Sequence, residues 1–305
     1  MAIGARRIYH VNSNCSDLPR AVRCYEALGL KRVTRTVPSR PQPGAAFGLD
    51  EVAWDAWMMH GDDGQAGLAL DLLEWRVPGP TGAPAPVGTP GFDRLVVTVP
   101  DLDRVLAAIS AAGGAVVGGP VPDPVDLALR TAMVCDPDGV RAQLVEGNST
   151  TLARVVITCT DLERAFAYYR DVMGLLPEGA AVNGHEPAAL HGLTADAAVR
   201  RARMRDGGSP FVVELVQWLD APPGAANAHV RAANELGLFR MAWSTDDCAR
   251  DEAIVRATGS LPFAPTGSLS VGDDLPRLHV LFWPGPSDEC LELIEVTTAS
   301  GALSA

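Results

Sequence analysis

The 305-residue sequence lacks several features that would mark it for particular partners. It has no apolar run near the ~20 residues of a membrane span, and its first residues lack the hydrophobic segment of a secretory signal. Basic residues are in deficit, with 25 Lys and Arg against 37 Asp and Glu, and Lys31 is the only lysine. A nucleic-acid partner would require a clustered basic face. The sequence therefore predicts a cytoplasmic protein with neither a nucleic-acid nor a membrane partner.

The cysteines lack the spacing of a metal site or a disulfide framework. No two of the six form a CxxC pair, and they are scattered along the chain at Cys15, Cys24, Cys135, Cys159, Cys248 and Cys290. This pattern is typical of reduced thiols that pack as small apolar residues. It excludes a zinc–thiolate site as the organising feature.

The sequence does contain one short segment that occurs four times in similar form. The copies open at His10, Arg94, Arg154 and Arg240, and seven residues after each of these stands an aspartate: Asp17, Asp101, Asp161 and Asp247. Aspartate at this position is typical of a helix N-cap. Each predicted helix then closes at a glycine, which tolerates the left-handed conformation of helix ends: Gly29, Gly113, Gly174 and Gly259. The fourth copy places Asp251 and Glu252 at positions that are apolar elsewhere, so its helix is expected to be shifted or more exposed.

Each copy continues with strand-like runs, so the repeated unit is strand, helix, three strands. Breaker-rich connections separate the copies at residues 77–90, 147–151 and 219–229. The pattern predicts an α+β fold of four tandem βαβββ modules, at about residues 7–75, 91–147, 152–219 and 236–297. The short middle connection predicts two domains, 1–148 and 149–305.

These residues resemble the vicinal oxygen chelate superfamily, the group of glyoxalases, bleomycin resistance proteins and extradiol dioxygenases. The segment "DPDGVRAQLVE" at 136–146 is similar to the last hairpin of that family, and "VVELVQW" and "CLELIEV" support it. The resemblance covers nearly the whole chain. It implies paired modules that form two cup-shaped, partly open β-barrels with the helices outside. In the metal enzymes of the family, the first and last strands of each module present the ligands of a divalent ion.

The resemblance transfers those ligand positions to four pairs of residues in this chain. They are His10 and Asp71, Arg94 and Gln143, Arg154 and Glu214, and Arg240 and Glu292. Arginine occupies three of the four first-strand positions, and a guanidinium only donates hydrogen bonds, so it cannot ligate a cation. Which modules share a cup stays open. Pairing the first with the fourth gives the best available metal site, which is His10, Asp71 and Glu292 against Arg240.

From this we expect a metal-independent pocket for a hydrophobic or polycyclic small molecule, as in the bleomycin-resistance branch, which binds an antibiotic. The expected ligand contacts are Arg94, Gln143, Arg154, Glu214, Arg240, Glu292 and Trp57. Trp54 and Trp57 face opposite ways in a regular strand, so only one of them can line a cup. The alternative for the arginine–glutamate residues is a structural ion-pair network in place of a metal.

Two enzymatic alternatives remain open. In the first, a metal-free isomerase, cyclase or lyase uses His10 as a general base oriented by Asp71, or an Arg/Glu pair. His10 as a core imidazole bonded to a carboxylate is the competing interpretation. In the second, a divalent metal supports a glyoxalase-type lyase or a dioxygenase. For an enzyme, proton-transfer chemistry is favoured over metal-dependent dioxygenation. No cofactor other than that metal is expected, and the chain is expected to be a monomer or a homodimer.

Overall fold

The computed structural model describes residues 2–5 and 7–296, and its first half contains two modules. The first module consists of β1 (Arg7–Asn14), α1 (Leu18–Ala27), β2 (Lys31–Thr36), β3 (Gln42–Pro43), the 3₁₀ turn η1 (Ala45–Phe47), β4 (Glu51–His60), the 3₁₀ turn η2 (Gly64–Ala66) and β5 (Ala69–Val77). The second consists of β6 (Gly91–Val99), α2 (Leu102–Ala111), β7 (Ala115–Pro122), β8 (Arg130–Cys135) and β9 (Arg141–Glu146).

The second half repeats the plan with one addition. The third module consists of β10 (Thr151–Thr158), α3 (Leu162–Asp171), β11 (Leu176–Pro177), β12 (Val182–Glu186), the short α4 (Ala188–His191), β13 (Ala197–Arg205) and β14 (Val212–Trp218). The fourth consists of β15 (Gly237–Ser244), α5 (Cys248–Ala257), β16 (Gly267–Leu269), β17 (Leu278–Pro284) and β18 (Cys290–Val296). The addition is the β12–α4 segment, which has no helical counterpart in the second module.

The four long helices begin and end where the sequence predicted. Each N-cap aspartate accepts a hydrogen bond from the backbone N–H three residues later, over 2.8–3.0 Å. The four closing glycines all have positive φ. The expected shift of α5 is wrong, because Asp251 is fully buried and accepts hydrogen bonds from Thr245 Oγ1 (2.6 Å) and the Gly4 N–H (3.0 Å). No helix in the described part of the chain is long and apolar enough to cross a membrane.

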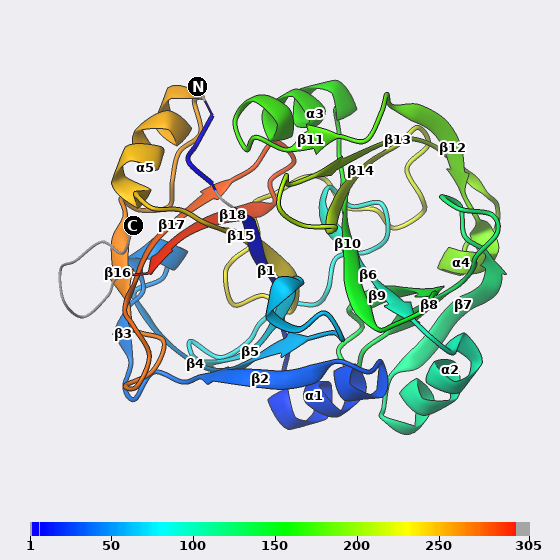
Figure 1. Cartoon of the computed structure of the whole chain (residues 1–305), viewed down its shortest axis with the longest axis horizontal. Helices are drawn as coiled ribbons and strands as arrows, with labels where there is room; N and C mark the ends of the chain where they lie inside the picture. Colours follow the sequence, from blue (N-terminus) through cyan, green and yellow to red (C-terminus); the bar gives the residue numbers. More distant parts are fainter. Residues whose placement is uncertain (1, 6, 297–305) are drawn as a thin grey trace.

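The strands form two sheets, and each sheet combines modules from both halves of the chain. The first has the order β16-β17-β18-β15-β1-β5-β4-β2, with β3 on β4, and the second has the order β11-β13-β14-β10-β6-β9-β8-β7, with β12 on β13. The first module therefore shares a sheet with the fourth, and the second with the third. Figure 1 shows this in the colours, with blue and orange-red strands together on the left and cyan and green strands together on the right.

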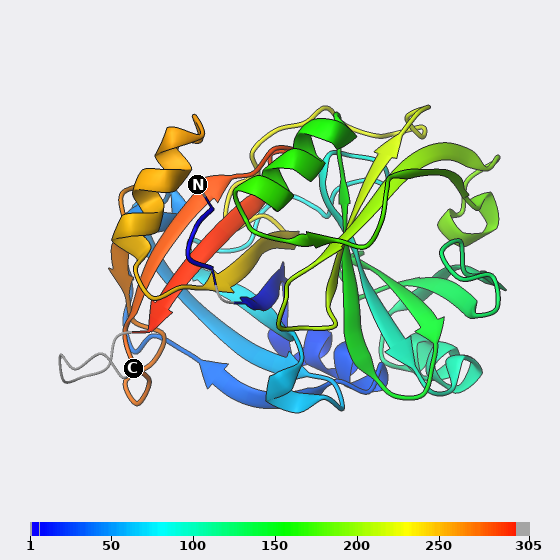
Figure 2. The ribbon, with the colours of Figure 1, turned by 45° about the horizontal axis from the view of Figure 1, so that its top comes forward.

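Both sheets curl, with the long helices on their outer sides (Figure 2). Within every module the first and last strands pair in parallel, and the two modules of a sheet join through the antiparallel pairs β1–β15 and β6–β10. One apolar core draws on all four modules and packs the helices and the outer strand faces together. We call the concave side of the first sheet the first cup and that of the second sheet the second cup. The α+β fold of four modules in two half-barrels is thereby confirmed.

Candidate functional site

Strand alternation decides which side chains enter the first cup. On β5, Asp71 and Leu73 line a cavity on the concave side, whereas Leu70 and Leu72 lie in the core on the other side. β1 departs from this rule, because its register against β15 shifts between Ile8 and His10. Such an irregularity re-aims a side chain. The neighbours Tyr9 and His10 consequently both line the cavity.

Two ion pairs that share one arginine form the floor of the first cup. Arg240 on β15 donates from Nη2 to Asp71 Oδ2 over 2.6 Å and from Nε to Glu292 Oε2 over 2.8 Å. All three side chains are at least nine-tenths buried. Pairing of β15 with β1, and of β1 with β5, brings Asp71 within reach of a residue of the fourth module. The sequence could not place these residues together without knowing this pairing.

The charges of this floor hold one another in their ionised forms. Burial opposes ionisation of Glu292, but Arg240 and then His10 outweigh it, so the pKa of Glu292 lies below its ordinary value. Burial likewise opposes the charge of Arg240, but Glu292 and Asp71 hold the pKa of the guanidinium above its ordinary value. Nη1 of Arg240 is buried without a hydrogen-bond partner. The floor therefore keeps one unused donor.

His10 lies beside these charges without being tied to them. Its Nε2 is 3.3 Å from Glu292 Oε2 and 4.0 Å from Asp71 Oδ2, and neither ring nitrogen makes a hydrogen bond. Asp71 instead accepts a hydrogen bond from the side-chain amide of Asn12 over 3.2 Å. The ring therefore lies at ion-pair distance from Glu292, with both nitrogens enclosed and neither of them hydrogen-bonded.

Above the floor lies a cavity of about 490 Å³ with mainly apolar walls. Four charged residues contribute to the lining, and they comprise two arginines and two carboxylates, namely Arg7, Arg240, Asp71 and Glu292. The walls come from the first and fourth modules and include Phe47, Trp54, Met58, Leu73, Leu269, Val271, Leu275, Leu278 and Ile294. Phe47 packs against Trp54 and Phe282 with ring centroids 6.1 and 4.6 Å apart. The first cup is thus hollow and aromatic.

Of the two tryptophans on β4, it is Trp54 that lines the cavity. Trp57 lies on the opposite face of the strand, where the guanidinium groups of Arg32 and Arg35 stand over its ring at 5.5 and 5.9 Å. Trp54 donates a hydrogen bond from Nε1 to Thr36 Oγ1 over 3.2 Å. That bond fixes the indole against the wall of the cavity.

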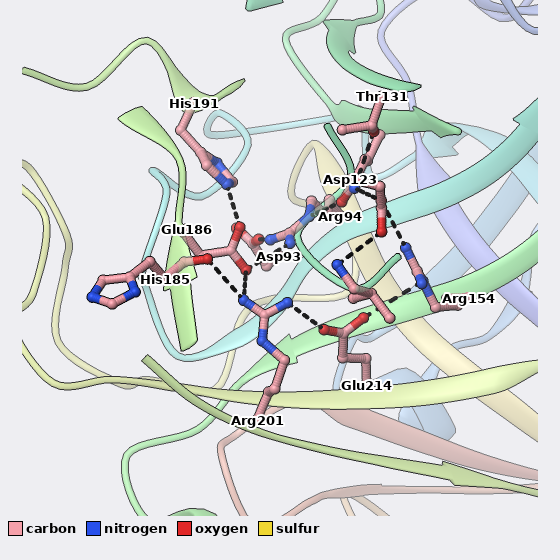
Figure 3. Close-up of polar contacts among 12 residues, drawn as sticks. Asp93, Arg94, Asp123, Thr131, Arg154, His185, Glu186, His191, Arg201 and Glu214 are labelled. Atoms are coloured by element: carbon pink, nitrogen blue, oxygen red, sulfur yellow. Dashed lines mark hydrogen bonds and ion pairs between the residues drawn. The ribbon is translucent and has the colours of Figure 1, made fainter. Parts of the chain in front are cut away.

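The second cup is filled by its own charged side chains, as Figure 3 shows. Glu186 lies in its centre. It accepts hydrogen bonds from Arg94 Nη2 (3.0 Å) and Arg201 Nη2 (3.4 Å), and its other carboxylate oxygen lies 2.7 Å from His191 Nε2. Arg94, fully buried, also contacts Asp93 and donates to Gln143 Oε1 (2.9 Å). The network continues to Arg154, Glu214 and Asp123.

The charges of this network balance, and its carboxylates are buried. Its four arginines, Arg94, Arg141, Arg154 and Arg201, face four carboxylates, Asp93, Asp123, Glu186 and Glu214. Buried charges are tolerated when they are paired in this way. Arg94, Gln143, Arg154 and Glu214 therefore lie together because the second and third modules share a sheet, which the sequence left open, and they do not line the cavity of the first cup. Only Arg240 and Glu292 of the expected ligand contacts do, with His10 and Asp71 beside them.

Several residues of both cups could not be found from the sequence. Tyr9 enters the first cup through the register shift in β1, and Phe47 enters from the turn η1. Glu186 and His191 enter the second cup from the β12–α4 segment, whose conformation no sequence period indicates. The adjacent breakers "NGHEP" signal an irregular segment but not its direction.

The residues of the floor do not fit the divalent ion that the resemblance implied. A cation among His10, Asp71 and Glu292 would lie against the guanidinium of Arg240, which already occupies one oxygen of each carboxylate. Among the described residues, no group of three or more His, Cys, Asp or Glu side chains is arranged to hold a metal ion. The donor set is therefore short of ligands and carries a repelling charge.

Comparison with known proteins agrees with the fold. Residues 7–144 match the family model of the Glyoxalase/Bleomycin resistance protein/Dioxygenase superfamily. No curated protein sequence matches the chain.

Solved structures extend the likeness to nearly the whole length. Glyoxalase I from Zea mays is 19% identical with a TM-score of 0.65, over 95% of this chain and 92% of that one. A putative dioxygenase from Bacillus subtilis is 14% identical with a TM-score of 0.62, over 97% and 87%. At such identities the likeness concerns the fold alone. Residues 7–144 are therefore similar in sequence to the Glyoxalase/Bleomycin resistance protein/Dioxygenase superfamily, and the fold of nearly the whole chain is similar to that of glyoxalase I from Zea mays.

Proposed function

We propose that the protein binds a hydrophobic, planar or polycyclic small molecule in the first cup without a metal ion, as a protein that sequesters a natural product or antibiotic. One observation carries this proposal. Arg240 bridges Asp71 and Glu292 at the floor of a cavity of about 490 Å³. The guanidinium thus lies where the donors of a divalent ion would converge, and it leaves the space above it to an organic molecule.

The size and walls of the cavity support such a ligand. Sites for drug-sized molecules usually span roughly 300–1,000 Å³, with apolar and aromatic walls and a few polar groups. Here Phe47 and Trp54 offer ring faces and edges, and Met58 offers an adaptable side chain. The charged lining residues balance, so nothing in the cavity attracts a strongly charged ligand. A bleomycin resistance branch within the superfamily is consistent with sequestration as the role.

Proton-transfer catalysis is the second candidate, and His10 favours it. A buried imidazole that lines the cavity with both nitrogens unused can remove or return a proton on a bound molecule. Glu292, held in its ionised form by Arg240, can stabilise the imidazolium that forms. An isomerase, cyclase or lyase would use this arrangement without a metal.

The proposal is tested by titrating the purified protein with anthraquinone and following tryptophan fluorescence, with and without a chelator. Binding is expected to be saturable and equally tight in both conditions. Leu278→Trp, which narrows the cavity from a half-buried wall position, should weaken binding at least about tenfold, or ~1.4 kcal/mol. The matched control Trp57→Phe, outside the cavity, should bind as the wild type does.

Two outcomes would contradict the proposal. One is the absence of saturable binding by any planar aromatic compound tried. The other is a stoichiometric transition metal that the chelator removes together with binding. If instead a bound compound is turned over, and His10→Ala abolishes turnover while binding persists, the protein is an enzyme of the second kind.

A further inference from the structure

A second histidine, His60, lines the same cavity as His10. It is the last residue of β4, and it pairs across the sheet with Ala69 on β5, which in turn pairs with His10 on β1. Neighbouring strands lie about 4.8 Å apart, so the two histidines are separated by roughly 10 Å along one row of the sheet. The residue between them carries only a methyl group. The two imidazoles thus lie in one row across the sheet, and both line the cavity.

The tautomer of His60 follows from its neighbour. Its Nδ1 lies 2.8 Å from the carbonyl oxygen of Gly64 in the turn η2. A carbonyl oxygen only accepts, so Nδ1 carries the hydrogen and donates it. Arg7 holds the same turn in place by donating from Nη2 to the carbonyl oxygen of Gln65 over 3.1 Å. The orientation of the His60 ring is therefore set by the backbone of this turn.

The other nitrogen of His60 is left as an acceptor. Burial is the largest influence on this group and lowers the pKa of His60 below its ordinary value, so the ring is neutral at pH 7. With the hydrogen on Nδ1, Nε2 has a free lone pair. Nε2 makes no hydrogen bond to any residue in the described part of the chain, and it is not among the fully enclosed unpaired atoms.

We propose that Nε2 of His60 accepts a hydrogen bond from a hydroxyl group of the ligand, so that the cavity selects phenolic planar compounds over their hydrocarbon or methyl-ether analogues. This inference rests on the proposed function, because it requires the ligand to occupy the first cup. An acceptor that a bound ligand shields from water and leaves unpaired costs binding free energy, and discrimination follows from that cost.

The test compares three probes that share one ring system: 2-hydroxyanthraquinone, 2-methoxyanthraquinone and anthraquinone, at a pH where the phenol is protonated. The wild type should bind the phenol about tenfold more tightly than either analogue. Anthraquinone controls for the bulk of the methyl group. Two variants separate the roles of the ring nitrogens. In His60→Asn the amide nitrogen replaces Nδ1 and keeps the donor to Gly64, and in His60→Gln the amide oxygen replaces Nε2 and keeps the acceptor.

His60→Asn should lose the tenfold preference, measured as the ratio of the Kd values of anthraquinone and of the phenol for that same variant, and His60→Gln should retain a preference for the phenol. If the wild type binds all three probes equally, this inference is overturned and the proposed function stands. If His60→Asn keeps the preference, His60 only anchors the turn and the inference is also overturned. If no probe binds the wild type, the proposed function fails, and the inference fails with it.

Discussion

At the scale of single residues, one guanidinium determines what the first cup can hold. Arg240 donates from two different nitrogens to two carboxylates that belong to different modules. The planar fork of arginine suits this geometry, whereas the point charge of lysine would reach fewer acceptors. Because arginine stays protonated throughout the accessible pH range, the floor remains occupied by a positive charge at every pH where the protein folds.

Replacing this charge by a metal ligand should change the cation preference of the cup. Arg240→His removes the repelling guanidinium and adds an imidazole to His10, Asp71 and Glu292, so it is expected to bind Zn²⁺ at least tenfold more tightly than the wild type. Calorimetric titration with Zn²⁺ measures the difference. The double variant Arg240→His/His10→Ala is the control and should lose most of the gain. Wild-type binding of Zn²⁺ as tight as that of Arg240→His would contradict the role assigned to Arg240.

The residues of the first-cup floor could be predicted from the sequence, but the strand face of other lining residues could not. The resemblance supplied the ligand positions, and the four readable repeats located them at residues that include His10, Asp71, Arg240 and Glu292. We expected Trp57 among the ligand contacts, but it is Trp54 that lines the cavity, since either face of the β4 strand suits a large aromatic residue. The entry of Tyr9 depends on a register shift that leaves no mark in the sequence.

At the scale of elements, the β12–α4 segment distinguishes the second cup from the first. It carries Glu186 and His191 into the concave side of its sheet, where the first cup has open space. Burial opposes the ionisation of Glu186, but Arg94, His191 and Arg201 outweigh it and hold the pKa of this carboxyl well below its ordinary value. Glu186 is thus the anion on which two buried arginines depend.

Removing that anion should destabilise the fold. Glu186→Gln leaves Arg94 and Arg201 without their shared partner in a buried site, which is expected to lower the free energy of unfolding by about 3–5 kcal/mol. Denaturant unfolding monitored by circular dichroism measures this change. Glu163→Gln, which breaks the exposed pair with Arg200, is the matched control and should cost less than about 1 kcal/mol. Equal effects of the two substitutions would show that the second cup does not depend on its network.

The four long helices could be predicted from the sequence, whereas the burial of Asp251 and the β12–α4 segment could not. The N-cap aspartates and closing glycines define four helices because each contributes a local hydrogen bond or backbone conformation that the sequence displays directly. The burial of Asp251 could not be predicted in this way, because it depends on a partner distant in the sequence, Gly4. Nor could the β12–α4 segment, because its position results from tertiary ion pairs rather than from periodicity.

At the scale of the whole molecule, two equivalent contacts join the sheets. Tyr169 on α3 donates to Glu289 of the fourth module over 2.5 Å, and Tyr25 on α1 donates to Asp136 of the second module over 3.3 Å. Each contact links a helix beside one sheet to the last hairpin of the other. Burial is the largest influence on both carboxyls, and it raises the pKa of Glu289 to about 7 and that of Asp136 to about 6.

The raised pKa of Glu289 predicts that the free energy of unfolding depends on pH. The folded state binds the proton more tightly than the unfolded state, so this contribution is complete below the ordinary glutamate pKa and is lost as pH rises through about 7. The free energy of unfolding should therefore contain a term that falls by up to about 3 kcal/mol across that window. Chemical unfolding at several pH values should show a shallower decline in Glu289→Gln. Tyr169→Phe, which keeps the carboxyl, should retain the decline, and an unchanged profile in Glu289→Gln would refute the assignment.

The pairing of the first module with the fourth has a consequence for biosynthesis. The second and third modules are consecutive in the chain, so their sheet can assemble as soon as both have left the ribosome. β1, in contrast, pairs with β15 of the fourth module, where His10 lies opposite Ala242. That edge of β1 stays unpaired until the fourth module has been synthesised. The half of the protein that contains the first cup is accordingly completed last, and its cavity forms only after the fourth module has been synthesised.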